Sequence, residues 1–376
     1  MIRAAAAPAT ALPAAARAAA LARLVRAGEL VLIPVAAILV AAGLFSLFLL
    51  ALGRSPVQFF ELVWRGGFAG AFSWQNSLQR AAPLILAALC VAIPARAGLL
   101  VIGGEGALVL SGFGAAAVAI PFLGLLPAVL VLIVMAVAAT AMGAAWIGLA
   151  GWLRQARGVN ETIATLLLTY VAIAIMNFFV EGPLRDPASA NKPSTLPIGR
   201  ETMIGPIPGT EVHWGLAAGL VACVAAWILA TRTTTGFALA IVGGNARAAM
   251  AQGLPVGRLV LLATGLGGAM AGLAGFFEVA AIHGQANASL AAGYGFTAIL
   301  VSFLARHHPL AIPPVAILFG GLAAAGGLVQ RRMGLPDATM LVLQGILFVT
   351  LLAADTLRGR FALAGSTLGA GGSAAS

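Results

Sequence analysis

Long apolar segments recur along almost the whole of this sequence, separated by short stretches that contain Arg, Pro, Gly or acidic residues. An α-helix rises about 1.5 Å per residue, so about 20 apolar residues cross the hydrocarbon of a bilayer. Of the 376 residues, 61% are hydrophobic and 9% are charged, which is more apolar surface than a soluble core buries. The pattern predicts an all-α protein that crosses a membrane many times.

About ten transmembrane helices fit this length. They cover residues 30–52, 77–97, 99–121, 125–152, 161–180, 212–231, 259–282, 290–304, 310–329 and 338–357. The eighth is the weakest, because its clearly apolar part is short and fits a broken or re-entrant segment as well. We predict a cytoplasmic N-terminal tail over residues 1–28, a transmembrane domain over residues 29–357 and a disordered, Gly/Ala/Ser-rich tail over residues 358–376.

The formal net charge of +10 does not indicate nucleic acid binding, because the basic residues stand in short loops and form no stripe. With the N-terminus in the cytoplasm, most of the 21 basic residues fall on the cytoplasmic side, which favours this orientation. The others flank spans on the opposite side, among them Arg80 and the contrary pair Arg331 and Arg332.

A short motif occurs twice: Arg-Gly-Val-Asn-Glu at 157–161 and Arg-Met-Gly-Leu-Pro-Asp at 332–337, each before an apolar helix. Five predicted spans separate the copies, so the second would be inverted relative to the first, as in many transporters. We therefore predict an inverted repeat of five plus five spans, over residues 29–211 and 212–357. Glu161 and Asp337 stand at helix starts, where they also suit a simple role as helix caps.

The sequence predicts no energy-converting or metal site. The one lysine, Lys192, lies in Asn-Lys-Pro, so the Gly-Lys-Ser/Thr end of a nucleotide-binding P-loop cannot form. Cys90 and Cys223 lie in separate spans and the histidines lack metal-binding spacing, so we expect packing cysteines, no metal and no cofactor. The sequence contains no recognisable pairing of a nucleophile with a general base, so nothing in it indicates an enzyme.

Residues 236–256 interrupt the spanning pattern on the predicted cytoplasmic side. Asn245 suits a helix N-cap, and the residues after it are good helix formers. Gly253 suits the left-handed C′ position, and Pro255 prevents continuation of the helix. The segment reads as a short capped helix, a pattern that also suits an ordinary interfacial connector.

The run Gly-Gly-Asn-Ala-Arg-Ala-Ala at 243–249, with Gly253, resembles the coupling loop of ABC importer permeases of the simple-sugar, nucleoside and branched-chain amino-acid family. Three more sets of motifs agree with this family. The first is Pro-Leu-Ile-Leu at 83–86 with Gly-Leu-Leu-Val-Ile-Gly-Gly-Glu-Gly at 98–106, and the second, closest to the nucleoside branch, is 158–166 followed by Glu-Gly-Pro-Leu-Arg-Asp-Pro at 181–187. The third consists of residues 271–275, 295–296, 318–320 and 344–345, which occur in matching order. The resemblance covers about residues 83–352.

This resemblance implies the permease subunit of an ATP-driven importer for a nucleoside, simple sugar or similar small polar solute, in the bacterial inner membrane. It also implies a partner ATPase that uses ATP and Mg²⁺, an extracytoplasmic solute-binding protein and a second permease chain, identical or related. The residues that would dock in the ATPase are Gly244, Asn245, Ala246, Arg247, Ala248, Ala249, Gly253 and Pro255.

Two carboxylates, Glu105 and Glu278, lie within predicted spans. Because burying a charge in a membrane is costly, our first hypothesis is that they serve the solute path. Both could instead be protonated or bonded to backbone. An ion-coupled secondary transporter, with one of them carrying the coupling proton, is the alternative to the ABC importer. Further candidates for a polar path are Thr169, Tyr170, Asn177 and Gln344.

The chain departs from the family signature at positions that would line the path. It has Val101 and Ala107 where the family usually has Asn and Gln, and Thr169 where Asn is frequent. A site that hydrogen-bonds one ligand rejects analogues that lack its groups, so these changes leave the identity of the solute open.

Overall fold

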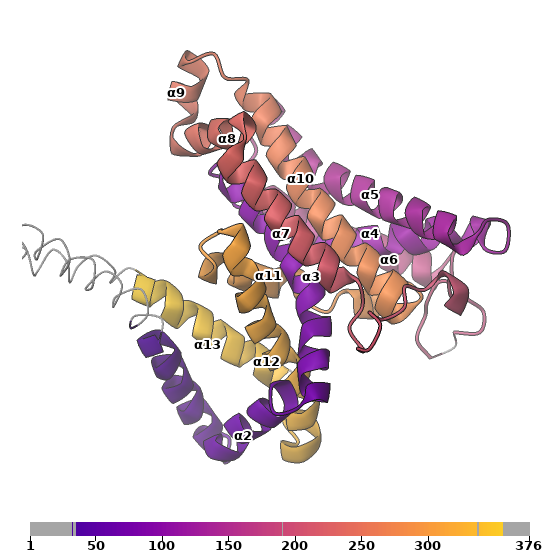
Figure 1. The fold of residues 1–376 in the computed structure, drawn as a ribbon, viewed down its shortest axis with the longest axis vertical. Coiled ribbons are helices and arrows are strands. Elements are labelled where there is room, and N and C mark those ends of the chain that lie inside the picture. Colours follow the sequence, from indigo (N-terminus) through magenta and orange to yellow (C-terminus); the bar gives the residue numbers. More distant parts are fainter. Residues whose placement is uncertain (1–31, 33–34, 190, 337, 356–376) are drawn as a thin grey trace, which may run out of the picture. The chain divides into compact units, whose positions relative to one another are not determined.

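The computed structural model describes residues 32, 35–189, 191–336 and 338–355. Within these ranges the protein is helical, and its only β pairing consists of two isolated bridges, Ser194 with Asn287 and Pro206 with His213. The chain divides into two compact units (Figure 1). The larger is Val57–Asp337, and the smaller combines the residues up to Pro56 with those from Ala338 onward.

Most helices belong to the larger unit. The long ones are α3 (Ala71–Ala95), α4 (Gly104–Ala119), α5 (Ala128–Arg157), α6 (Glu161–Glu181), α7 (Gly215–Arg232), α10 (Val256–Phe277) and α12 (Ile312–Met333). The shorter ones are α2 (Pro56–Gly67), α8 (Thr234–Gly244), α9 (Ala246–Ala251) and α11 (Tyr294–Leu304). The smaller unit contains the helix Val35–Ala51 and α13 (Ala338–Asp355).

A helix is found at each of the ten predicted spans, which confirms the all-α, multi-pass prediction. The count of ten is not confirmed. Seven helices of the described chain are long and apolar enough to cross a membrane, and an eighth span results if Val35–Ala51 and Pro56–Gly67 count as one broken span. The predicted eighth span corresponds to the short apolar stretch Ala288–Leu304. The sequence patterns missed α2 and α8 as separate helices.

The two copies of the repeated motif end their preceding helices in the same way. Gly158 after α5 and Gly334 after α12 adopt left-handed φ angles of 68° and 66°, and each donates its N–H to a carbonyl four residues earlier. The cap expected of Glu161 is instead provided by Asn160, whose side chain accepts from the first N–H groups of α6. Asp337 and the two predicted tails lie outside the described residues, and the inverted repeat stays a prediction.

Helix α3 is the central helix of the larger unit. It packs against α7, α10, α11 and α12, and 78% of its most apolar window is buried, against 22% for α5. Its run from Pro83 to Pro94 is buried throughout. A helix that is apolar on all sides can be placed inside a bundle, which explains this position. Cys90 in α3 and Cys223 in α7 are free and buried, as predicted for packing residues.

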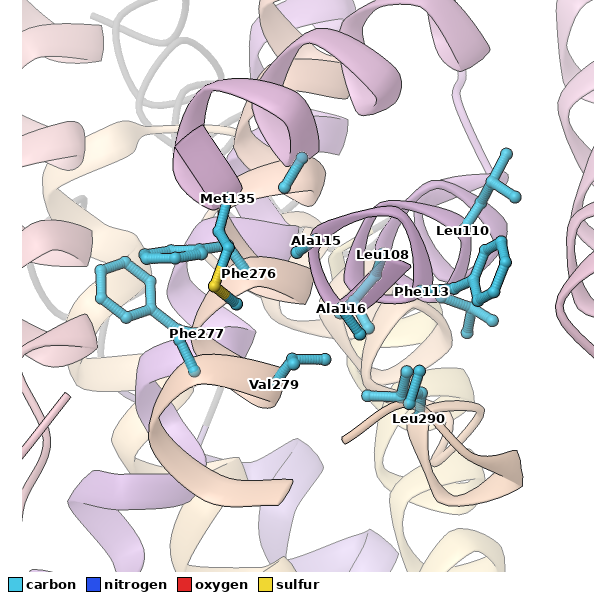
Figure 2. Close-up of a cluster of buried hydrophobic side chains, with 14 of the residues drawn as sticks. Leu108, Leu110, Phe113, Ala115, Ala116, Met135, Phe276, Phe277, Val279 and Leu290 are labelled. Carbon is cyan, nitrogen blue, oxygen red and sulfur yellow. The ribbon is translucent and has the colours of Figure 1, made fainter. Parts of the chain in front are cut away.

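Helices α4, α5 and α10 form the main hydrophobic core (Figure 2). Leu108 of α4, Met135 of α5 and Phe276 of α10 are among its members. The α5–α10 crossing is close because glycines face backbone: a Cβ on Gly143 would overlap the carbonyl of Gly268, and one on Gly272 the carbonyl of Ala139. The small residues of α10 thus allow this close helix crossing.

Candidate functional site

The segment at residues 236–256, predicted to contain a short capped helix, contains one in the structure. Helix α9 begins after Asn245, whose Oδ1 accepts hydrogen bonds from the N–H groups of Arg247 (3.0 Å) and Ala248 (3.1 Å). The helix ends at Ala251, and Gly253 has a φ of +79°. Helix α10 starts directly after Pro255. The result is a rigid projection whose shape depends on local capping.

One face of this projection is free and the other is anchored. Seven of the eight residues of the predicted docking set are exposed: Gly244, Asn245, Ala246, Arg247, Ala248, Gly253 and Pro255. Ala249 is fully buried, in a cluster of apolar side chains that also contains Leu99, Leu239 and Val260. A force applied to the exposed face would therefore pass into α8, α10 and the chain around Leu99.

Helix α8 seats this projection on the end of α3 through a glycine contact. A Cβ on Gly243 would overlap the carbonyl oxygen of Arg96 and lie 2.9 Å from the backbone N of Gly98. Arg96 in turn donates from Nη2 to the carbonyl of Ala230 at the end of α7, at 3.0 Å. The short segment that follows α3 is thus in direct backbone contact with α8.

That segment, residues 98–103, is held by the first turns of α6. The hydroxyl of Thr162 donates to the carbonyl of Leu100 (2.9 Å), and the hydroxyl of Thr165 accepts from the N–H of Ile102 (3.2 Å). Glu161 accepts from the N–H of Leu100 (3.3 Å) and forms an ion pair with Arg154. Residues 98–103 therefore form an ordered connection between the α8 contact and the start of α4.

Glu105 lies in the first turn of α4 and is 1% exposed. Its two carboxylate oxygens accept hydrogen bonds from the backbone N–H groups of Gly293 (2.7 Å) and Gly295 (2.5 Å), at the start of α11. A Cβ on Gly295 would overlap the backbone N of Glu105, so two helix N-termini meet here. A negative charge suits the positive ends of both dipoles. Of the two arrangements expected for a buried carboxylate, Glu105 has the backbone-bonded one.

Glu278 is also 1% exposed but is less completely bonded. It begins a π-helical turn, Glu278–His283, that continues α10. Its Oε2 lies 3.3 Å from Nε2 of His283, whereas its Oε1 is buried without a hydrogen-bond partner. Single π-turns inside helices are frequent at functional sites.

The other predicted path residues do not gather around these carboxylates. Thr169 is fully buried and donates to the carbonyl of Thr165, and a Cβ on Gly106 would lie 2.5 Å from its Cα, so it is a packing residue of the α4–α6 contact. Tyr170 is 64% exposed on another face of α6, and Asn177 is partly buried. Gln344 belongs to α13 in the smaller unit.

Two residues that the sequence interpretation missed, Arg80 and Tyr294, interact with one another at the start of α11. Arg80, expected to flank a span, is nine residues inside α3 because this helix begins at Ala71. Its side chain hydrogen-bonds to the hydroxyl of Tyr294, which also lies in the electrostatic field of Glu278 and Glu105. An arginine within a predicted span was the available signal.

No group of three or more His, Cys, Asp or Glu side chains in the described ranges is arranged to hold a metal ion. The candidate site consists of buried hydrogen-bonding groups and the capped projection.

Comparison with known proteins places these features in context. A family model described as the permease component of the branched-chain amino acid transport system matches residues 73–352. A glucose ABC transporter permease protein of Haloferax volcanii is 35% identical, over 86% of this chain and 87% of its own length. A guanosine ABC transporter permease protein of Bacillus subtilis is 28% identical, over 87% of this chain and 94% of its own. A nucleoside ABC transporter permease protein of Lactococcus lactis is 26% identical, over 85% and 90% respectively.

Proposed function

Because this chain belongs to the ABC transporter permease family of the branched-chain amino acid transport type, and is a multi-pass permease of an ABC importer, we propose that it imports a nucleoside or a simple sugar. The names of its relatives support this choice of solute. The proposed location of the protein is the bacterial inner membrane, with its N-terminus in the cytoplasm.

The partners proposed are an ABC ATPase, which binds and hydrolyses ATP with Mg²⁺, an extracytoplasmic solute-binding protein, and a second permease chain, identical or related. This chain binds no cofactor in the proposal. The absence of a P-loop in its sequence is consistent with this division of labour.

The observation that carries the coupling proposal is the seat of the capped projection. The docking face comprises Gly244, Asn245, Ala246, Arg247, Ala248, Gly253 and Pro255, and the buried Ala249 forms its base. Movement of this face would pass from Gly243 to the backbone at Arg96–Gly98, then along residues 98–103 to α4. From there the hydrogen bonds of Glu105 reach the start of α11.

Reconstitution tests the function. The permease, its ATPase and the binding protein are placed in proteoliposomes, and accumulation of guanosine and of glucose is measured with and without ATP. We expect uptake that requires both ATP and the ATPase. Uptake that persists without the ATPase but collapses with a proton ionophore would instead establish the ion-coupled alternative.

A substitution on the projection tests the docking face. Ala248→Asp places a charge on an exposed position in the first turn of α9, where the helix dipole tolerates it, so folding is preserved. We expect loss of co-purification with the ATPase and loss of transport-coupled hydrolysis. Thr210→Asp in the exposed loop before α7 is the matched control and should change neither. Retained coupling in Ala248→Asp would contradict the docking assignment.

A further inference from the structure

Polar side chains from three separate elements converge around the start of α11. Arg80 from α3 hydrogen-bonds to Tyr294, the first residue of α11, and Glu278 from the π-turn after α10 acts electrostatically on the same hydroxyl. Within the larger unit, α3 packs against both α11 and α10, and the π-turn continues α10 (Figure 1). Arg80 and Glu278 both lie in helices long and apolar enough to cross a membrane, where charged groups usually serve the solute path.

Two atoms of this cluster have no partner. Oε1 of Glu278 and Nε of Arg80 are both buried and make no hydrogen bond. Native proteins rarely leave buried polar atoms unbonded, because the lost hydration is then not replaced. One atom is an acceptor and the other a donor, so together they present an unused complementary pair.

The rest of the cluster holds these two atoms in position. His283 lies against the other oxygen of Glu278 at 3.3 Å, and Tyr294 bonds to the guanidinium of Arg80. Neighbouring Glu105 differs, because both its oxygens are already occupied by backbone N–H groups. Unlike Glu105, Glu278 and Arg80 therefore each retain a buried polar atom without a partner.

A loop lies over this end of α10. The N–H of Ile204 donates to the carbonyl of Ala280 (2.8 Å), and the N–H of Ile198 donates to the carbonyl of Gly284 (2.9 Å). Thr195 exchanges hydrogen bonds with Ala286 through its backbone N–H and its hydroxyl. The π-turn that carries Glu278 is thus held by hydrogen bonds to the loop between α6 and α7.

We propose that Glu278 and Arg80 bind the vicinal diol of the transported solute, an inference that rests on the proposed import function. The carboxylate oxygen accepts a hydrogen bond from one hydroxyl, and the guanidinium N–H donates to its neighbour. Both the ribose of a nucleoside and the ring of a simple sugar carry such adjacent hydroxyls. Branched-chain amino acids lack them, so the pair selects against that class of solute.

The test compares each solute with an analogue that lacks one of the two hydroxyls. Guanosine is paired with 2′-deoxyguanosine, and glucose with its 2-, 3- and 4-deoxy derivatives. Uptake ratios are measured in proteoliposomes for the wild-type complex and for Glu278→Gln. The binding protein and ATPase are the same in both complexes, so their own preferences cancel when the two ratios are compared.

We expect Glu278→Gln to reduce the preference for the hydroxylated solute about tenfold, as for loss of a charge-assisted hydrogen bond. Arg80→Lys keeps the charge but lacks the Nε donor, and it should reduce the same ratio. This variant replaces Glu278→Gln in the test if Glu278→Gln does not accumulate in the membrane. Glu61→Gln makes the same chemical change at an exposed carboxylate paired with Arg65 and should leave the ratio unchanged. The solute pair that responds identifies nucleoside or sugar as the cargo.

Slower uptake with unchanged ratios in both variants would overturn the diol site while leaving the import function intact. Failure of the wild-type complex to accumulate either solute would instead contradict the proposed function, and the diol site with it. The two failures are therefore distinguishable in one set of measurements.

Discussion

The carboxylate of Glu105 accepts a hydrogen bond from the backbone N–H of Gly295, 190 residues further along the chain, at 2.5 Å. This contact joins the first turn of α4 to the first turn of α11, where two positive helix ends meet. Without a side chain on Gly295, the backbones approach closely enough for the bond to form. Glu105 therefore acts as a connection between helices in addition to any role toward solute.

Removal of this carboxylate should destabilise the protein. Glu105→Ala leaves the N–H groups of Gly293 and Gly295 without acceptors, and we expect a loss of about 3 kcal/mol, seen as a lower thermal unfolding midpoint in detergent. Glu105→Gln keeps one acceptor and should lose less. Glu61→Gln at the exposed pair with Arg65 is the control. Normal abundance and unchanged uptake in both Glu105 variants would contradict the connecting role and the path role together.

The glycine contact between α8 and the end of α3 should be sensitive to an added methyl group. Gly243→Ala places a Cβ against the backbone of Arg96 and Gly98, so we expect a cost of roughly 1–3 kcal/mol and reduced coupling of ATP hydrolysis to uptake. Gly265→Ala in α10 is the matched control, because nothing lies within 4 Å of its added Cβ and it lies outside the docking face. Equal coupling in the two variants, measured as solute imported per ATP hydrolysed, would show that the α8 seat does not transmit movement.

The N-cap of α9 should determine how well the projection is formed. Asn245→Ala removes the acceptor for the N–H groups of Arg247 and Ala248 and should weaken this short helix by about 1 kcal/mol. We expect weaker co-purification with the ATPase. Asn245→Asp keeps the capping oxygen and should retain it, so loss of binding in both variants would mean that the amide contacts the ATPase directly.

His213, in the loop that leads into α7, should make stability depend on pH. Burial lowers the pKa of its imidazole, although the charge of Glu278 acts in the opposite direction, and its Nδ1 accepts from the N–H of Gly215 at 3.1 Å. The folded state thus favours neutral imidazole. This contribution is present above the ordinary pKa of 6.5 and is lost as the pH falls through the lowered value.

The measurement is the thermal unfolding midpoint in detergent at pH values from about 8 to about 5, a range that brackets the ordinary histidine pKa. The wild type should become less stable toward the acidic end of this range. His213→Asn keeps an acceptor for Gly215 without a titrating ring and should flatten the curve. The same slope in both proteins would assign the pH dependence to other groups.

Much of the local structure could be predicted because it depends on neighbouring residues. The capped helix at Asn245 and the left-handed glycine at Gly253 follow from side-chain capping and backbone sterics over a few positions. Helix α2 was missed because its residues, Pro56–Gly67, are less apolar and too few to span. Glu161 was mistaken for a cap because an acidic residue suits both the cap and the first turn.

The candidate site was harder to predict, because its members are brought together by packing. Thr169 and Tyr170 looked equivalent as polar residues in a span, yet one is buried against Gly106 and the other is exposed. Arg80 was counted as a flanking charge because the start of its helix was placed too late. Its contact with Tyr294 crosses more than 200 positions and leaves no local pattern.

The sequence by itself determined that this protein is a helical membrane permease with a capped projection, because hydrophobic length, capping and family motifs are all read over short windows. Only the tertiary structure decided which polar atoms are satisfied. It gave Glu105 two backbone donors and left one oxygen of Glu278 without a partner. That difference depends on which helix ends meet in three dimensions, and both residues look alike in the sequence as single carboxylates in apolar surroundings.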